Sequence, residues 1–380
     1  MFGPLLLRAL CAMAALLPLI ASATVIPWTG PIQNVSSGAP GVKTGWGVND
    51  RGHVAWSGSG TWYWDGTSAT NLSAGGTFYG IGAGDRVVWQ ETDALGYGDI
   101  YTWDPLGNTN TNISNTYGVN DRYASIGPSG QVAWEGNTTS NSYDIFLWDG
   151  TSKADISNLG GGDYSPRFGT SGDLCWYSSS LSGWYWDGSS VRLLGYPGSV
   201  YGVQMDGSDN VFAQVSIGGK LEIMRWEKAT NTYQNISQTP SDTDDYGFSV
   251  RPDGTVAWAG RHDGLTDRDI YYWDGSTKTN ISNSTGMDTY PGADPNGEWV
   301  VWIHDNLVYA WDGDARTYQV SPDPAPGHVA SYSGASINNG WIVYGDGADV
   351  YRTHIPEPGT FALLGLGVAA LAFWRRRRKA

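Results

Sequence analysis

The sequence predicts an all-β protein, an eight-bladed β-propeller of four-stranded blades. Three columns of similar short segments recur along the chain, and the spacing between copies matches the length of one blade. The two ends of the repeated region also complement each other. Among 380 residues the chain carries 20 Trp and 53 Gly, a composition that suits buried strands joined by tight turns.

The first column is a hydrophobic triplet that predicts the second strand of each blade. It consists of two aliphatic or small residues followed in most copies by Trp, and such a strand is expected to be covered on both faces. Its eight copies end at Trp56, Trp89, Trp134, Trp176, Ala213, Trp258, Trp302 and Tyr344.

The second column is an aromatic run followed by an acid, and it predicts the third strand with its turn. The acid is expected to form the turn, because Asp and Gly favour the backbone angles of tight hairpins. Seven copies end at Trp64, Trp103, Trp148, Trp186, Trp226, Trp273 and Trp311. The eighth copy, Val350-Tyr351-Arg352, lacks both the Trp and the acid.

The third column is a short polar-apolar-polar segment that predicts the outer strand. Successive copies are separated by 37 to 45 residues, which matches one propeller blade. Five copies are also Asn-X-Ser sequons, and the repeat explains them without glycan. The copies start at Asn34, Asn71, Asn112, Asp155, Arg192, Asn235, Asn280 and Gln319.

The ends of the repeated region predict that the ring closes on itself. The region begins with a lone outer strand in PIQNVS (31–36), and its last unit (336–356) has three strands but no outer one. If the first strand completes the last blade, eight full blades form a ring without free sheet edges. Seven blades are the alternative, because the fifth unit, around Val211, is degenerate.

The first 23 residues have the features of a signal peptide. Arg8 precedes an apolar run, and Ala21-Ser22-Ala23 is a small-X-small sequence, so cleavage is expected between Ala23 and Thr24. The propeller is then expected over residues 24–355. Cys11 lies in the removed segment, which leaves Cys175 as the one thiol and no internal disulfide.

Charge and residue spacing exclude several function classes. The formal net charge of −15 argues against a nucleic-acid partner. The five His residues have no pairing at metal-ligand spacing, and Cys175 is expected to be a buried apolar residue. No cofactor is expected, with Ca²⁺ as the alternative at three acidic stretches, 206–210, 241–245 and 263–269.

Ligand contacts are expected on the loops between the second and third strands, because propeller loops gather on one face of the disc. The longest of these loops lie in the second, third and sixth units. They supply the candidates Tyr97, Tyr143, Arg261, His262 and Asp263. Acids also recur just before the third strand and are expected to be structural, namely Asp99, Asp144, Asp269 and Asp349.

The repeats resemble TolB-type, WD-like propeller repeats. SVRPDGTVAW (249–258), DIYYWDG (269–275) and TNIS (279–282) carry this resemblance, which extends over residues 25–355. The Gly-His pair that precedes the first strand of true WD repeats is missing. The resemblance implies the architecture and leaves the activity open.

The last 25 residues, 356–380, resemble a PEP-CTERM sorting signal. Pro356-Glu357-Pro358 precedes an apolar segment from Phe361 to Trp374, and five cations follow it. The residues that match the signal are Pro356, Glu357, Pro358, Arg375, Arg376, Arg377 and Arg378. The resemblance implies a Gram-negative host, an exosortase-type sorting enzyme as partner, and a destination at the cell surface or in an exopolysaccharide matrix.

The apolar segment of this tail is short for a membrane span. At ~1.5 Å per residue its helix would reach ~21 Å, less than the ~30 Å of the bilayer core. We therefore expect transient insertion into the inner membrane, with the cations left in the cytoplasm. A plain tail anchor is the alternative.

These observations favour an exported, non-enzymatic binding module of the cell surface or biofilm matrix. Exopolysaccharide or envelope proteins are the expected partners. Two alternatives remain open at this point. One is a hydrolase or lyase that acts on polysaccharide, with carboxylates supplied by the long loops, and the other is a TolB-like scaffold for envelope proteins.

Overall fold

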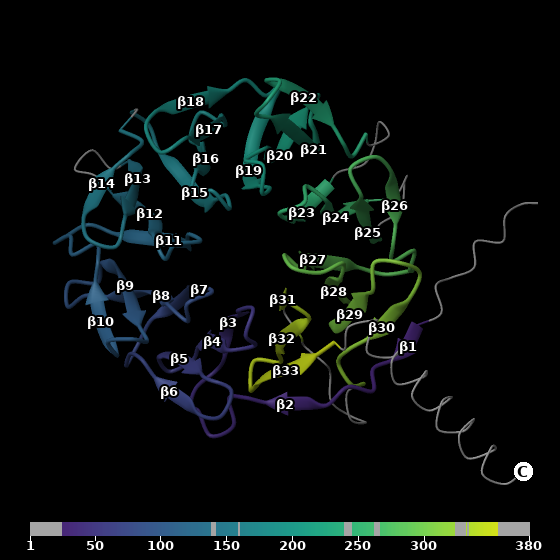
Figure 1. Cartoon of the computed structure of the whole chain (residues 1–380), viewed down its shortest axis with the longest axis horizontal. Coiled ribbons are helices and arrows are strands. Elements are labelled where there is room, and N and C mark those ends of the chain that lie inside the picture. The colour runs from purple at the N-terminus through teal and green to yellow at the C-terminus, as the bar shows by residue number, and fades with distance from the viewer. Residues whose placement is uncertain are drawn as a thin grey trace, which may run out of the picture.

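The chain forms a ring of eight β-sheets around a common axis (Figure 1). The computed structural model describes residues 25–137, 142–158, 160–238, 245–261, 267–323, 332 and 334–355. Seven sheets have four strands and one has five. In blades 1 to 6 successive strands lie side by side with the first nearest the axis, and in blades 7 and 8 the N-terminal strands β1 and β2 are added at the outer edge. The predicted eight-bladed propeller is confirmed, and the seven-bladed alternative is wrong.

The first four blades use consecutive strands. Blade 1 contains β3 (Thr44–Val48), β4 (Val54–Ser57), β5 (Thr61–Trp64) and β6 (Ala69–Asn71). Blade 2 contains β7 (Thr77–Ile81), β8 (Val87–Thr92), β9 (Gly98–Asp104) and β10 (Thr109–Asn112). Blade 3 contains β11 (Asp121–Ile126), β12 (Val132–Asn137), β13 (Tyr143–Trp148) and β14 (Lys153–Asp155). Blade 4 contains β15 (Asp163–Phe168), β16 (Leu174–Ser178), β17 (Gly183–Trp186) and β18 (Val191–Leu194).

The remaining blades complete the ring. Blade 5 contains β19 (Ser199–Met205), β20 (Val211–Ile217), β21 (Lys220–Glu227) and β22 (Thr232–Asn235). Blade 6 contains β23 (Asp245–Val250), β24 (Val256–Arg261), β25 (Arg268–Trp273) and β26 (Lys278–Asn280). Blade 7 contains β27 (Asp288–Ala293), β28 (Val300–His304), β29 (Leu307–Trp311) and β30 (Thr317–Gln319), with β1 (Val25–Pro27) as a fifth strand. Blade 8 contains β31 (Ala335–Asn338), β32 (Trp341–Gly345), β33 (Val350–His354) and β2 (Ile32–Asn34).

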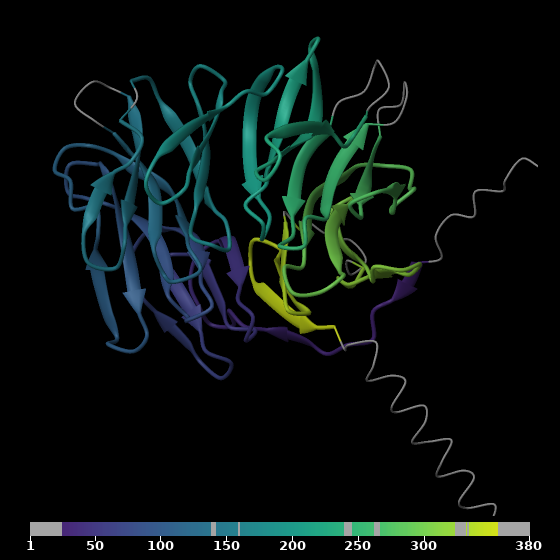
Figure 2. The same cartoon turned by 45° about the horizontal axis from the view of Figure 1, so that its top comes forward.

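The N-terminal strands close the ring. β2 pairs antiparallel with β33, with Ile32 opposite Thr353, and so completes blade 8 as the sequence predicts. β1 pairs in parallel with β30, with Val25 opposite Thr317, which the sequence did not predict. The N-terminal segment from β1 to β2 is therefore paired with both blade 7 and blade 8. In Figure 2 this purple segment lies beside the green and yellow strands of these two blades.

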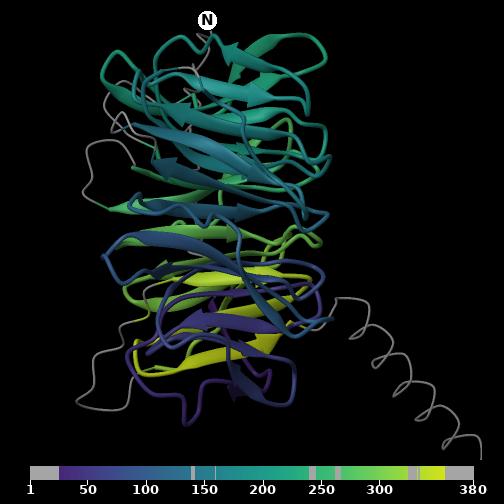
Figure 3. The same cartoon turned by 90° about the vertical axis from the view of Figure 1, so that its left-hand side faces the viewer.

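The two faces of the disc carry different connections (Figure 3). The turns from the first to the second strand, and from the third to the fourth, share one face, here called the turn face. The connections from the second to the third strand, and from blade to blade, share the other, here called the loop face. The first residues of each inner strand thus lie towards the loop face.

The Trp residues of the first column form the core between blades. Six of them, on the second strands, are at most 1% exposed. Eight hydrophobic clusters each join one blade to the next, the last linking Val343 and Val350 of blade 8 to Trp56 of blade 1. The prediction that these Trp residues are core is confirmed.

A Ser after the outer strand, buried in six blades and half-buried in blade 1, holds the third strand by a hydrogen bond in seven blades. In blade 2 the Ser114 hydroxyl accepts a hydrogen bond from the Ile100 amide at 2.9 Å and donates one to Asp99 at 3.1 Å. Five of these Ser residues end the sequons, so the sequon hydroxyl has a structural partner. The seven are Ser36, Ser73, Ser114, Ser157, Ser237, Ser282 and Ser321.

The acids of the repeat are turn and strand anchors, as predicted. The Asp187 carboxylate accepts the amides of Ser189 and Ser190, at 2.9 and 2.8 Å, and Asp65, Asp149 and Asp274 form the same turn. Asp269 and Asp349 accept from the buried Ser hydroxyls, as Asp99 does.

The predicted signal peptide, its cleavage site at Ala23 and Thr24, and the tail from Pro356 lie outside the described residues. Within the part of the chain that the structure describes, no helix has the length and apolar character needed to cross a membrane.

We expect Ser114→Ala to lower the free energy of unfolding by roughly 1–3 kcal/mol, because it leaves the buried Ile100 amide without an acceptor. The matched control, Ser152→Ala, removes an exposed turn hydroxyl and should change it by no more than about 0.5 kcal/mol. Urea denaturation of both variants measures the difference. Equal effects would contradict the structural role of the buried Ser.

Candidate functional site

The structure spreads the sequence-predicted ligand residues around the loop face. Tyr97, 41% exposed, precedes β9 in blade 2. Tyr143 begins β13 in blade 3, and the exposed Arg261 ends β24 in blade 6, across the ring from Tyr97 (Figure 1). His262 and Asp263 lie outside the described residues. Of the three candidates that the structure describes, Tyr143 alone joins a cluster of side chains that reaches the inner strands.

That cluster is centred on Arg122, the second residue of the inner strand β11. The Arg122 guanidinium carbon lies 3.9 Å from the centre of the Tyr143 ring and 4.9 Å from that of Tyr123. Its Nε donates to Glu135 Oε2 at 3.0 Å. The cation is thus held between two aromatic faces and one carboxylate, a geometry that favours a guanidinium over an ammonium group.

The aromatic surface continues into both neighbouring blades. The Tyr143 ring lies 6.2 Å from that of Tyr164 on β15, and Tyr164 lies 5.7 Å from Tyr177 on β16. In the other direction, Tyr123 lies 6.1 Å from Tyr79 on β7. Five Tyr rings therefore run from blade 2 to blade 4 near the loop face.

Glu135 positions Arg122 and joins blade 3 to blade 4. It is buried on β12, and its Oε1 accepts the Ser165 amide of β15 at 2.8 Å. Burial raises the pKa of the Glu135 carboxyl, and the Ser165 amide, Arg122 and Arg167 each offset part of the rise. Because both oxygens already accept hydrogen bonds, this carboxylate serves to hold the site rather than to exchange a proton with a ligand.

Arg167 on β15 adds a second cation close to Glu135. Its side chain is exposed to solvent on an inner strand. Partial desolvation by the surrounding protein lowers the pKa of the Arg167 guanidinium, and the charge of Glu135 offsets part of this effect. Within the described residues Arg167 forms no hydrogen bond and no ion pair. Arg122, Tyr123, Glu135, Tyr143, Tyr164 and Arg167 are here called the Arg122 cluster.

The inner strands share a second feature, a β-bulge against the second strand in blades 1 to 7. Blades 1 and 6 place Gly45 and Gly247 at the bulge with positive φ, as a bulge of this kind favours. Blades 3 and 7 place Tyr123 and Tyr290 there instead, with φ of 50° and 53°. For a bulky side chain this conformation costs ~1–2 kcal/mol.

These strained Tyr residues are also exposed. Tyr123 is 53% and Tyr290 67% exposed, and they belong to blades on opposite sides of the ring. Tyr201, at the bulge of blade 5, is 47% exposed. Rings held open to solvent at a strained position, where Gly serves elsewhere in the same fold, indicate a functional constraint.

The charged residues of the Arg122 cluster are marked in the sequence by their place in the repeat and not by loop length. The residue after the first-column triplet is small, aliphatic, aromatic or amide-bearing in the other blades, and only Glu135 there carries a charge. Arg122 and Arg167 likewise stand in inner strands, and the inner strands of the other blades contain no Lys or Arg. Departures from the repeat on strands, rather than loop length, mark the site.

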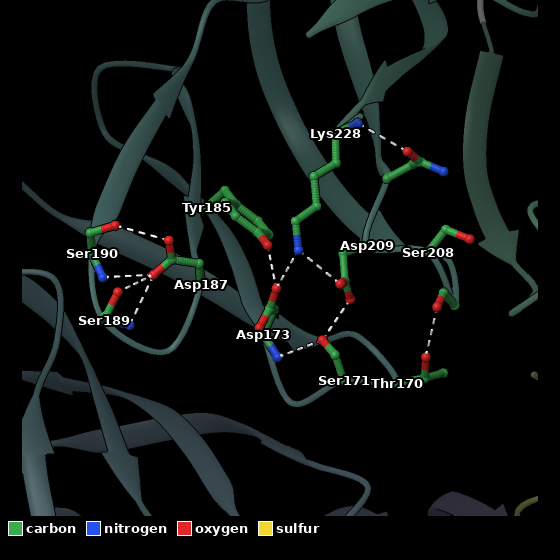
Figure 4. Close-up of polar contacts among 12 residues, drawn as sticks. Thr170, Ser171, Asp173, Tyr185, Asp187, Ser189, Ser190, Ser208, Asp209 and Lys228 are labelled. Carbon is green, nitrogen blue, oxygen red and sulfur yellow. Dashed lines mark hydrogen bonds and ion pairs between the residues drawn. The ribbon is translucent and has the colours of Figure 1, made fainter. Parts of the chain in front are cut away.

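A second polar cluster lies on the turn face and is structural (Figure 4). Lys228 Nζ lies 3.0 Å from both Asp173 Oδ2 of blade 4 and Asp209 Oδ2 of blade 5. The Tyr185 hydroxyl donates to Asp173, and the Ser171 hydroxyl donates to Asp209 at 2.6 Å. These bonds use the polar groups to join two blades.

The acidic stretches considered for Ca²⁺ are partly described. In 206–210, Asp206 accepts the Ser208 and Asn210 amides, and Asp209 is engaged by Ser171 and Lys228. Asp245 accepts from Trp258 Nε1 at 2.9 Å, while 241–244 and 263–266 lie outside the described residues. Over the described ranges, no group of three or more His, Cys, Asp and Glu is placed to hold a metal ion.

Cys175 is fully buried in the cluster between blades 4 and 5. Burial raises the pKa of its thiol, which keeps it protonated and unreactive. The prediction of a small buried apolar residue is confirmed.

Comparison with known proteins identifies the C-terminal signal. Residues 354–378 match the PEP-CTERM protein-sorting motif, so the resemblance of the tail is confirmed. This motif implies exosortase-dependent export and sorting to the cell surface in Gram-negative bacteria. No curated protein matches the chain.

Several solved structures share the propeller fold. Virginiamycin B lyase from Staphylococcus aureus has a TM-score of 0.50 and 11% identity, over 86% of this chain and 99% of the lyase. An oligogalacturonate lyase in complex with manganese has a TM-score of 0.55 and 10% identity, over 89% and 99%. TolB from Acinetobacter baumannii has a TM-score of 0.42 and 15% identity, over 73% and 65%. At these identities the likeness to the two lyases concerns the fold alone.

We expect Arg122→Met to lower the free energy of unfolding at pH 7 by roughly 2–3 kcal/mol, because it leaves the buried Glu135 without its charge partner. Adding Glu135→Gln should restore most of the loss, since the amide oxygen still accepts the Ser165 amide. Arg225→Met, which breaks the 3.7 Å pair with the more exposed Glu227, is the control and should cost under ~1 kcal/mol. Additive losses in the double variant, measured by urea denaturation, would contradict the pairing.

Asp121, at the start of β11, should make stability depend on pH. It accepts from Trp134 Nε1 at 3.1 Å, and burial raises its pKa to about 6. The folded state then binds a proton more tightly than the unfolded state, so this contribution to stability is present below pH ~4 and is lost as pH rises through about 6.

We therefore expect Asp121→Asn, which stays uncharged, to gain stability relative to the native protein between pH ~4 and ~7, by up to roughly 3 kcal/mol. Urea denaturation across this pH range measures the difference. The exposed Asp149→Asn should show no such gain, and a stability difference for Asp121→Asn that does not change with pH would disprove the shift.

Proposed function

We propose that this protein is an exported, non-enzymatic glycan-binding module that works at the cell surface or in the exopolysaccharide matrix of a biofilm. The observation that carries the proposal is the Arg122 cluster, which presents Tyr rings and the exposed Arg167 on inner strands near the loop face. The export step is implied by the sorting motif at 354–378.

The chemistry of the cluster favours a sugar polymer with carboxylates. A sugar ring has an apolar face of C–H groups and a rim of hydroxyls, which match the face and the hydroxyl of Tyr. Arg167 lacks an ion-pair partner within the described residues, although the whole chain carries a net charge of −15. An exposed Arg in this setting suits a ligand carboxylate.

The residues predicted from the loops would provide further contacts for the same ligand. Tyr143 belongs to the Arg122 cluster, and Tyr97 and Arg261 lie on the same face farther along the ring. His262 and Asp263 follow Arg261 in the sequence and complete the set. A long polymer would contact several blades at once, which multiplies weak contacts.

The point at which the tail leaves the propeller suggests how the molecule is oriented beside the membrane. The Ile355 amide donates to Gly340 O at 2.7 Å, in the turn between β31 and β32, so the chain leaves from the turn face. Five residues, 356–360, then separate Ile355 from the apolar segment and span at most ~18 Å. During transient insertion in the inner membrane the turn face would lie beside the bilayer, with the loop face and its ligand site directed away.

The test is binding of the host's own exopolysaccharide to the mature protein by isothermal titration calorimetry. We expect Tyr123→Gly and Tyr290→Gly each to weaken binding ~3–10-fold, because each removes an aromatic contact. Both substitutions relieve backbone strain, so the fold should be kept or stabilised. Arg167→Ala should weaken binding of an acidic polymer roughly tenfold and leave a neutral one unchanged.

Tyr233→Ala on the outer strand β22 is the matched control and should bind normally. Unchanged affinity in both Tyr123→Gly and Arg167→Ala would remove the support for the Arg122 cluster as the ligand site, whatever Tyr290→Gly does in blade 7. Turnover of the polysaccharide would favour a hydrolase or lyase instead. Cross-linking that traps an envelope protein in place of glycan would favour a scaffold.

A further inference from the structure

An apolar pocket of 390 Å³ lies on the turn face, at the seam where the ring closes between blades 7 and 8. Its walls come from Trp28, Trp299 and Tyr318, with Ile26, Arg316 and Ile355 at its edges. This site, here called the seam pocket, lies on the opposite face from the Arg122 cluster. It is a second candidate site that the ligand proposal does not use.

The aromatic walls of the seam pocket are fixed by ring closure. Trp28 follows β1, and its Nε1 donates to Thr353 Oγ1 of β33 at 3.0 Å. The Trp28 ring meets Tyr318 edge to face at 6.0 Å, and Tyr318 lies 5.5 Å from Trp299. Because Trp28 belongs to the closing segment, the pocket exists only once the N-terminal strands have paired.

The sorting motif begins at the edge of this pocket. Ile355, which lines the pocket, is 2% exposed and is held by its hydrogen bond to Gly340. The next residues of the chain are Pro356, Glu357 and Pro358. No linker therefore separates the pocket from the motif that the sorting enzyme is expected to recognise.

The chemistry of the motif matches the pocket. Pro-containing segments in extended, polyproline conformation dock into grooves lined by aromatic side chains. Residues before Pro are biased towards extended backbone, which here applies to Ile355 and Glu357. The exposed Arg316, beside the Tyr318 hydroxyl, offers a cation for the Glu357 carboxylate. The one acid of the pocket, Asp312, accepts the Arg316 amide at 3.1 Å within its turn.

We propose that Pro356-Glu357-Pro358 docks within the same molecule into the seam pocket, with the Pro rings against Trp28, Trp299 and Tyr318 and Glu357 paired with Arg316. The sorting enzyme then competes with the propeller for the motif. Docking also requires a closed ring, so the state of the motif depends on whether the propeller has folded.

The test measures how fast a thiol beside the motif reacts with a bulky maleimide, in the full chain carrying Gly359→Cys. Cys11→Ser removes the thiol of the signal peptide, and Cys175 is 0% exposed and gives no background. Docking should slow labelling. We expect Trp299→Ala and Arg316→Glu to raise the rate, roughly tenfold for the first.

A charge swap makes the test specific. Glu357→Arg alone should raise the labelling rate, and Glu357→Arg combined with Arg316→Glu should return it to the slow value. Arg192→Glu, an exposed site in blade 4, is the matched control and should leave the rate unchanged. Because Arg316 is exposed, its variants report on docking even if Trp299→Ala disturbs the core.

Equal labelling rates in all variants would overturn the proposal, and so would failure of the charge swap to restore the slow rate. A rate that falls as protein concentration rises would place the motif in the pocket of a second copy and would also overturn it. No polysaccharide enters the experiment, so its result is independent of the ligand proposed for the loop face.

Discussion

The pairing of β2 with β33 is the contact on which the rest of the structure depends. Without it blade 8 has three strands and its outermost strand, β33, presents an open edge. Each of the eight hydrophobic clusters lies between two blades, so the cluster between blades 8 and 1 forms only when the ring closes. The parallel pairing of β1 with β30 strengthens the same seam from blade 7.

The repeat and the departures from it have different roles. Repeated residues, such as the buried Trp of the second strand and the Ser after the outer strand, hold every blade in the same way. Arg122, Glu135 and Arg167 place charges where the corresponding strand positions of the other blades carry none, and Tyr123 and Tyr290 adopt a positive φ at a bulge that is Gly in blades 1 and 6. Functional sites are expected where a sequence that is otherwise consistent with its fold departs from it.

The fold could be predicted from the sequence because the same pattern of strands and turns occurs eight times along the chain. Blade number, ring closure through Ile32–Asn34, the buried Trp residues and the turn role of acids such as Asp187 all follow from spacing and turn chemistry. The parallel strand Val25–Pro27 was missed because it has no copy elsewhere in the chain.

The candidate site was only partly predictable. Tyr143 was identified from loop length, but Arg122, Tyr123, Glu135 and Arg167 lie on strands that the repeat marks as scaffold. Their proximity depends on the bulges of the inner strands and on the packing of blade 3 against blade 4, and neither can be read from spacing. In the seam pocket, likewise, Trp28 contacts Tyr318, and this contact forms only when the ring of blades closes.

The sorting motif and the proposed ligand site lie on opposite faces of the propeller. The chain leaves the turn face just before the motif, and the ligand site lies near the loop face. Hydrogen–deuterium exchange of the mature protein, with and without the host's exopolysaccharide, tests this account most directly. The account predicts that the polymer protects amides in 121–124, 143–145 and 163–167. Protection confined to the turn face or to the outer strands would contradict it.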